Sequence, residues 1–220
     1  MATEQKFLGV RYATPVSQPL LVQDRVEATA RGGRRVPYRT TIGGVYWEWA
    51  LRFIDSRVTG FGFNRKQAAH MARVGLGAFD LVCPQLPDTV GVNYEMYEEP
   101  AGIDSKLLKV DRGASIGTTE VYLERNAGAP TAVPLRAGRF ITFGADKFPY
   151  MVIGANDLSF TGSGAQQVII KPNLMVSVLP NVEVHLNPII SALYAIEEYD
   201  VPNMEPRPIM YDRTIRFRTA

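Results

Sequence analysis

The chain is poor in the residues that build disulfides and metal centres. It has one cysteine, Cys83, and two histidines, His70 and His185, among 220 residues. A single cysteine excludes a disulfide framework within the chain, and its place in an apolar segment before Pro84 predicts a buried thiol. No short spacing joins these three side chains, so we predict no metal site and interpret each histidine as an ordinary exposed or half-buried residue.

Long apolar runs and a strong net charge are also missing. No run approaches the roughly 20 apolar residues that cross a bilayer, and residues 1–6 lack the charged-then-apolar pattern of a signal peptide. We therefore expect a soluble protein that is synthesised in the cytoplasm. The formal net charge is only +2, which gives no general case for binding nucleic acid or membranes.

The charges are unevenly distributed along the chain. Residues 1–80 carry 12 Lys and Arg against 6 Asp and Glu, whereas residues 81–130 carry 4 against 8. Solvated surface charge is the simplest interpretation, and complementary self-association is the alternative. The candidate contact residues flank a Gly-Gly turn or lie in an irregular acidic segment; they are Arg31, Arg34, Arg35, Glu95, Glu98 and Glu99.

Patterns typical of catalysis and cofactor binding are weak. No Gly-x-Gly-x-x-Gly follows a strand, and the arginines at the Gly-Gly turn lack the Lys-Ser/Thr and the helix of a phosphate loop. Gly162-Ser163-Gly164 is interpreted as a turn rather than a nucleophile elbow. Cys83 and His70 lie on opposite sides of a predicted helix end, with no orienting Asn or Asp. We predict no catalytic residue, no cofactor and no enzymatic activity.

The clearest strand spans residues 42–53. From Val45 onward the residues alternate, so that one face of an extended strand carries both tryptophans of the chain. That face must lie against another sheet or a helix. We therefore predict a central strand whose core side chains are Trp47, Trp49, Leu51 and Phe53.

One short helix is predicted after this strand. Asn64 has the character of an N-cap, with Gln67 in the capping-box position, and Gly60-Phe61-Gly62-Phe63 before it is interpreted as a loop. A strand over 79–83 follows the helix and ends at Pro84. The predicted buried stripe consists of Ala68, Met71, Ala72, Gly75 and Phe79, and His70 lies off it.

The sequence pattern changes over residues 103–186, where short strand candidates alternate with turns. Such spacing is typical of a small antiparallel barrel or sandwich. Its aromatic residues Phe140, Phe143 and Tyr150 are interpreted as core, together with Ile141; the alternative is an exposed platform that stacks on bases or sugars. The strand candidates are 106–110, 119–124, 139–143, 149–153, 167–171 and 182–186.

The end of the chain resembles its beginning in its arginine-rich, alternating pattern. Residues 187–212 are interpreted as irregular, with one helical turn around 192–198, and the alternation over 213–218 predicts a last strand. The simplest organisation is one β-rich domain made of residues 1–100 and 187–220, into which a barrel of residues 103–186 is inserted. The expected fold is mainly β with one short α-helix.

Several of these patterns, taken in order, resemble a known group of proteins. The central strand begins Ile42-Gly43-Gly44-x-x-Trp47-Glu48, and a helix-to-strand unit ending at Pro84 follows. The later matches are Leu135-x-Ala137-Gly138-x-Phe140-Ile141-x-Phe143-Gly144, the return strand Tyr150-Met151-Val152, Gly162-Ser163-Gly164, Val168-Ile169-Ile170 and an alternating last strand. In this order they resemble tail structural proteins of tailed bacteriophages, of the distal tail type.

The resemblance implies a virion protein at the end of a phage tail. Proteins of this kind form a homo-oligomeric ring, as a hexamer, from β-sandwich-like domains, and some carry an outer barrel resembling an oligonucleotide-binding fold. The implied partners are other copies of the chain, the tail tube protein, the tail-tip hub and fibre proteins, and a cell-surface glycan. The alternatives are another tube, neck or baseplate component, or a carbohydrate- or nucleic-acid-binding module.

Overall fold

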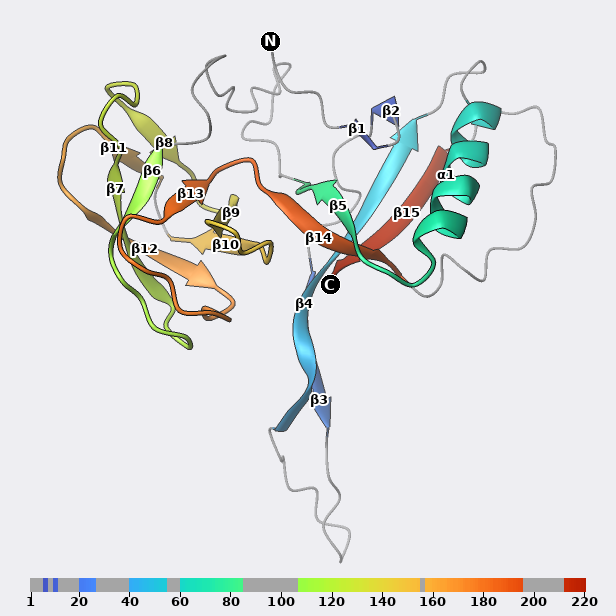
Figure 1. The fold of residues 1–220 in the computed structure, drawn as a ribbon, viewed down its shortest axis with the longest axis horizontal. Coiled ribbons are helices and arrows are strands. Elements are labelled where there is room, and N and C mark those ends of the chain that lie inside the picture. Colours follow the sequence, from blue (N-terminus) through green and yellow to red (C-terminus); the bar gives the residue numbers. More distant parts are fainter. Residues whose placement is uncertain are drawn as a thin grey trace, which may run out of the picture.

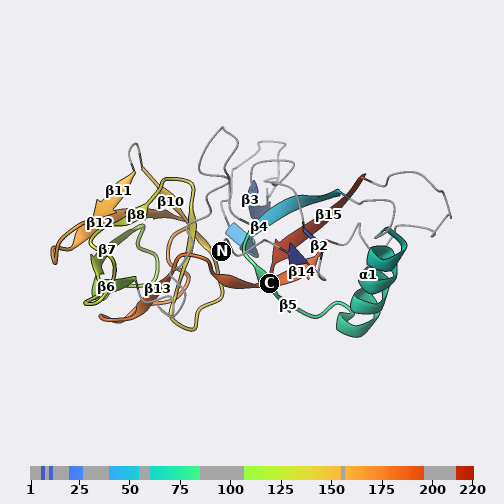
Figure 2. The same cartoon turned by 90° about the horizontal axis from the view of Figure 1, so that it is seen from above.

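The computed structural model describes most of two β-rich units and one helix. Within the described residues the fold is mainly β with one α-helix and antiparallel sheets throughout, as predicted. The strands form a five-stranded sheet and a closed barrel. In Figure 1 the sheet lies between the helix and the barrel, and Figure 2 shows the same order from above. The described residues are 6–7, 10–11, 20–26, 40–54, 60–84, 107–154, 157–195 and 212–220.

The elements follow one another in a simple order, with a single helix between β4 and β5. They are β1 Lys6–Phe7, β2 Val10–Arg11, β3 Leu20–Val26, β4 Thr40–Ile54, α1 Gly60–Val74, β5 Phe79–Val82, β6 Leu108–Arg112, β7 Glu120–Arg125, β8 Val133–Leu135, β9 Phe140–Phe143, β10 Tyr150–Ile153, β11 Leu158–Phe160, β12 Gln166–Lys171, β13 Glu183–His185, β14 Ile189–Tyr194 and β15 Asp212–Thr219.

The five-stranded sheet takes its strands from both sides of the barrel segment in the sequence. Its order is β3-β4-β15-β14-β5, so the last two strands of the chain lie in its middle. The longest pairing joins β15 to β4 and runs from Asp212 opposite Ile54 to Arg218 opposite Glu48. The sheet therefore cannot be completed without the residues that follow the barrel segment in the sequence.

The predicted central strand is confirmed as β4. Trp47, Trp49 and Leu51 are buried on one face, as period-two alternation requires, while the side chain of Phe53 lies outside the described residues. On β15 the same face carries buried Ile215 and Phe217, joined by the alternating residues of β14, which are Ile190, Ala192 and Tyr194. This face is the apolar core of the sheet.

The helical turn predicted around 192–198 is wrong, because residues 189–194 form the strand β14. Its backbone pairs with β5 on one side and with β15 on the other. Ile190, Ala192 and Tyr194 are buried at alternate positions, a pattern that only an extended strand produces. The helix propensity of alanine is worth less than about 1 kcal/mol per residue, so pairing on both edges outweighs it.

The predicted helix start is also wrong, and the predicted stripe is correct only for Ala68, Met71 and Phe79, which are half-buried. The helix α1 begins at Gly60, four residues before the predicted cap, so Asn64 and Gln67 form no capping box. Its inner side presents buried Gln67 with half-buried Met71 and Val74. Ala72 and Gly75, which were assigned to the stripe, are exposed.

His70 explains why the buried side of the helix differs from the apolar stripe. Its Nδ1 lies 2.9 Å from the Tyr194 hydroxyl, and its ring stands edge-on to Phe79 at 4.9 Å. A polar ring therefore docks the helix on the sheet. Partial burial, with a smaller contribution from the Arg73 charge, lowers the pKa of His70 below its usual value of 6.5.

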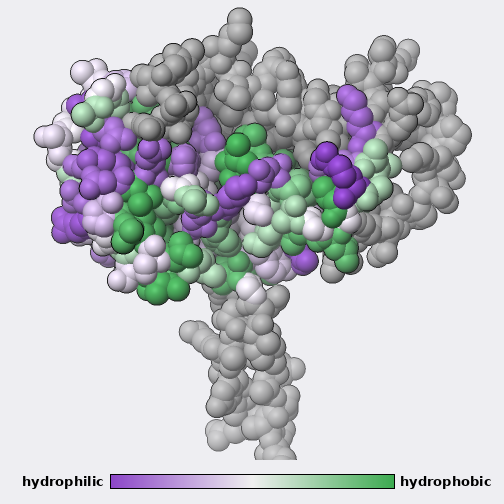
Figure 3. Space-filling view, in the orientation of Figure 1, coloured by the Kyte–Doolittle hydropathy of each residue, from purple (hydrophilic) through white to green (hydrophobic). Residues whose placement is uncertain are grey.

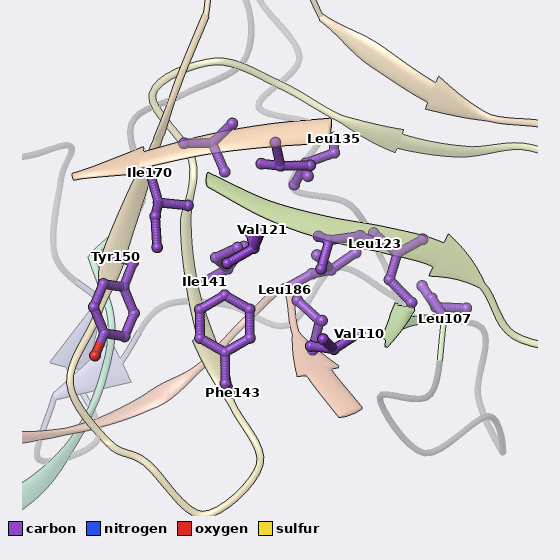
Figure 4. Packing of buried hydrophobic residues seen from close by; sticks show 14 of the residues in the cluster. Leu107, Val110, Val121, Leu123, Leu135, Ile141, Phe143, Tyr150, Ile170 and Leu186 are labelled. Carbon is purple, nitrogen blue, oxygen red and sulfur yellow. The ribbon is translucent and has the colours of Figure 1, made fainter. Parts of the chain in front are cut away.

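The barrel prediction is confirmed. Six strands close it in the order β10-β12-β7-β6-β13-β9, one more than the five of an oligonucleotide-binding barrel. Each corresponds to a predicted strand, and β8 and β11, which the pattern missed, pair as a separate ribbon. Figure 4 shows the side chains that fill the barrel, among them Leu123, Ile141 and Phe143.

The chain enters and leaves the barrel at adjacent points. The first barrel strand, β6, pairs with the last, β13, and Leu108 lies opposite Val184. The exit is anchored from both units. Buried Arg139 donates hydrogen bonds to the Leu186 carbonyl (3.1 Å) and the Asn187 side chain (3.0 Å). The Cys83 amide donates to the Pro188 carbonyl at 2.8 Å, so little freedom remains in the link to β14.

The docking of α1 predicts a stability that depends on the protonation of His70. A pKa lowered by folding means that the unfolded chain binds the proton more tightly, so this contribution is full above about pH 6.5 and is lost as the pH falls through the folded-state pKa. Urea unfolding at pH 7.5 and pH 5.0 should show a smaller acid-induced loss in His70→Gln than in the wild type. Equal losses in both proteins would contradict this role.

Candidate functional site

The two units meet where an aromatic residue of the barrel packs onto the tryptophan face of the sheet. Phe140, at the start of β9, lies 4.9 Å from the Trp47 ring and 5.5 Å from the Trp49 ring, edge-on to both. All three side chains are buried. Edge-to-face pairs of this kind add about 0.5–1.5 kcal/mol each to the burial of apolar area, so we define this aromatic junction as Trp47, Trp49 and Phe140.

Directed hydrogen bonds fix the orientation of the aromatic junction. The Trp47 indole N–H donates to the Pro149 carbonyl of the barrel at 2.9 Å, and its backbone N–H donates to the buried Thr219 hydroxyl at 3.1 Å. An exposed ion pair between Lys147 and Asp80 (2.6 Å) adds a contact at the rim, where such pairs contribute little. The barrel is therefore held on the sheet by packing and by a specific indole bond.

A hairpin arm extends beyond the sheet. The pairing of β15 with β4 stops at Glu48, whereas β4 continues back to Thr40 and pairs there with β3. We define the hairpin arm as residues 22–26 of β3 and 40–46 of β4. At about 3.3 Å per residue it is about 23 Å long, and Figure 1 shows it projecting away from both units.

Within the hairpin arm, each of the two strands pairs only with the other among the described strands. Its pairing includes an irregularity between Gln23 and Arg25, which twists the ribbon. An isolated two-stranded hairpin is marginally stable in water. The backbone on its outer edges can pair with a strand of another chain, and so the arm has the geometry of an assembly element.

The predicted site residues fall into two groups. Trp47, Trp49, Leu51, Phe140, Ile141 and Phe143 are all buried in the two cores or between them. The candidate contact residues Arg31, Arg34, Arg35, Glu95, Glu98 and Glu99 lie outside the described residues. The Gly32-Gly33 turn signal predicts a hairpin in this part of the chain, but the length of the paired arm was not predicted. The aromatic junction was missed, and its only signal was the placement of both tryptophans on one strand face.

The barrel aromatics do not form a stacking platform. Phe140, Phe143 and Tyr150 are buried, and the Tyr150 hydroxyl is engaged, donating to Asp146 at 3.0 Å and accepting from the Met175 amide at 3.1 Å. On the outer wall, the Tyr122 ring is covered by the Arg112 guanidinium at 3.9 Å. These aromatic faces are therefore occupied by the protein itself.

The Cys83 thiol and the serine of a Gly-x-Ser-x-Gly pattern both lack the surroundings of a catalytic nucleophile. Complete burial raises the pKa of the Cys83 thiol well above its usual value, so the thiol stays protonated at neutral pH. Residues 113–117 contain a Gly-x-Ser-x-Gly pattern that pattern analysis overlooked. It lies between the antiparallel strands β6 and β7, whereas a nucleophile elbow joins a strand to a helix. Among the described residues, no cluster of three His, Cys, Asp or Glu is placed to hold a metal ion.

No family model and no curated protein among those compared matches the chain. Within the part of the chain that the structure describes, no helix has the length and apolarity needed to cross a membrane.

The aromatic junction predicts a large loss of stability when its contacts are removed. Trp47→Ala deletes a buried ring and should lower the free energy of unfolding by about 3–5 kcal/mol. Trp47→Phe keeps a ring but leaves the Pro149 carbonyl without its donor, which should cost about 1–3 kcal/mol. Denaturant unfolding of the purified variants measures both. A fully stable Trp47→Ala protein that only failed to assemble would reassign Trp47 from core to subunit contact.

Proposed function

We propose that this protein is a structural subunit of a phage tail, of the distal tail type, that forms a ring between the tail tube and the tail-tip hub or fibres. The ordered set of motifs that resembles this group motivates the proposal. The observation that carries it is the hairpin arm, a paired ribbon about 23 Å long that projects beyond the sheet of its own subunit.

A ring needs two different surfaces on each subunit. In a closed homo-oligomer of this type, one patch of a subunit contacts a different patch on the next, and the rotation closes the circle. The sheet ends in two distinct edge strands, β3 and β5, and β3 is part of the arm. An arm that reaches the neighbouring subunit supports such a head-to-tail contact and gives its backbone new partners.

The aromatic junction supports a subunit in which the barrel has a fixed place on the sheet. The barrel is fixed to the sheet through buried rings and the indole bond from Trp47 to Pro149, and the exit from the barrel is anchored by Arg139 and Cys83. A barrel held this way keeps a defined position relative to the ring. It can therefore present a fixed outer surface to a fibre or hub protein.

The binding-module alternative receives less support. Its main sequence feature was the set of aromatic residues in the barrel, and these side chains are buried. The position of the protein within the tail is a separate matter: a neck, tube or baseplate component uses the same subunit contacts. Immunogold labelling of virions in electron micrographs decides it. Label at the distal end of the tail supports the proposal, and label in the head or neck contradicts it.

The assembly role of the hairpin arm can be tested at Gly44. A Cβ at this residue meets no atom within 4 Å, so a long side chain there leaves the subunit fold intact. Gly44→Arg should abolish or strongly weaken the ring seen by negative-stain electron microscopy and by light scattering after gel filtration. Gly164→Arg in a barrel loop is the matched control, because its Cβ also has open space. A Gly44→Arg protein that assembles like the control would remove the arm from the interface.

A further inference from the structure

Three side chains of different chemical kinds meet on the outer wall of the barrel, where the chain enters and leaves it. The Lys109 nitrogen Nζ lies 2.9 Å from the Asn181 side-chain oxygen Oδ1 and 2.8 Å from the Glu124 carboxylate. Lys109 comes from β6, Glu124 from β7 and Asn181 from the turn before β13. Polar side chains gather on the barrel in Figure 3, at the end of the molecule where these strands lie in Figure 1. An amine, a carboxamide and a carboxylate therefore share one site.

The backbone holds the three groups in place. Lys109 lies directly opposite Glu124 in the pairing of β6 with β7. The Asn181 amide donates to the Val110 carbonyl at 2.7 Å, and the Val110 amide donates to the Val182 carbonyl at 2.9 Å. Asn181 has a φ of 62°, in the left-handed region that asparagine tolerates better than most residues. Its carboxamide is therefore kept beside β6, within reach of Lys109.

The distances bring the Lys109 nitrogen close to the carboxamide carbon of Asn181. Because a C=O bond is about 1.23 Å long, Nζ lies at most about 4.1 Å from Cγ, near the roughly 3–3.5 Å of atoms that are about to react. The Lys109 and Glu124 side chains are only 28% and 21% exposed. Partial loss of water makes the charged pair costly, and this lowers the cost of passing a proton from the ammonium to the carboxylate.

We propose that Lys109 and Asn181 form an isopeptide bond within the barrel, with Glu124 as the group that moves the protons. Glu124 takes a proton from the ammonium, and the neutral amine attacks the Asn181 carboxamide carbon. Glu124 then passes protons from the amine to the amide nitrogen, and the bond between that nitrogen and the carbon breaks. The products are the Lys109–Asn181 amide and an ammonium ion, which carries away two protons of the former Lys109 ammonium. Glu124 ends as a carboxylate, and no oxidant or cofactor is consumed.

The bond closes the barrel at the point where it joins the sheet. It links the first barrel strand to the turn before the last one, between residues that are 72 positions apart in the sequence. A covalent link of this length restricts the unfolded chain and so favours the folded barrel. Asn181 is exposed, so the ammonia leaves directly into water. The reaction takes place within one subunit and does not depend on the proposed role in a tail.

Intact mass spectrometry of the purified full chain tests the bond. The wild type should weigh less than its sequence by one ammonia molecule, and protease digestion should release a branched peptide that joins Lys109 to Asn181. Lys109→Arg should keep its full mass, and so should Asn181→Gly, which retains the left-handed backbone. A wild type that keeps its full mass after prolonged incubation would overturn the proposal. A loss of ammonia that persists in Asn181→Gly would contradict it as well, since another residue would then react.

The part played by Glu124 has its own test. Glu124→Gln retains the shape of the side chain but removes the proton acceptor, so it should form the bond at least tenfold more slowly than the wild type. Glu120→Gln, at the start of the same strand, is the matched control and should react like the wild type. Circular dichroism checks that both variants are folded. Equal rates in the two variants would contradict the proposed mechanism.

Discussion

The burial of Phe140 against Trp47 and Trp49 is the contact on which the arrangement of the molecule depends. The sheet has one strongly apolar face, and among the described apolar side chains of α1 it is Met71 and Val74 that pack against it. The barrel covers the other end of that face with Phe140, Phe148 and Met151. Without the barrel the tryptophans would form an exposed apolar patch of the kind that leads to aggregation. The barrel is therefore a structural layer of the sheet as well as a unit with its own core.

The alternating strands could be predicted because their signal is local. Period-two burial in β4 and β15, and the short strands of the barrel, follow from neighbours in the sequence. The core assignment of Trp47 rests on the same rule. In β9 all four residues are buried, and Phe140 packs on the sheet while Phe143 packs in the barrel, so their apolar character and not alternation indicated that they are core. The aromatic junction could not be predicted this way. Its indole bond joins residues 102 positions apart, and no local pattern specifies which distant backbone carbonyl a tryptophan will find.

The errors in the predicted helix and in the predicted helical turn have different physical origins. Gly60-Phe61-Gly62 has low helix propensity, yet α1 begins at Gly60, so local propensity does not locate the start of this helix. On the inner side of that helix, His70 takes a place that hydrophobicity assigned to alanine, since Tyr194 supplies a hydrogen-bond partner. In β14 the short apolar alternation follows Pro188 and includes Ala192, so the local signal was ambiguous. Only its neighbours β5 and β15 make it a strand.

The pairing of β6 with β13 has a consequence for how such a protein can evolve. The chain enters the barrel near Leu108 and leaves it near Val184, and these two residues lie opposite each other in paired strands. The barrel is therefore joined to the sheet through two closely spaced ends, as a loop would be. Insertions with adjacent ends are tolerated because they leave the host geometry unchanged. A different folded unit can therefore replace this one by recombination, provided that it brings an aromatic side chain to cover Trp47 and Trp49. The barrel is the part of the molecule that can be exchanged, and the requirement that stays is an aromatic side chain that covers Trp47 and Trp49.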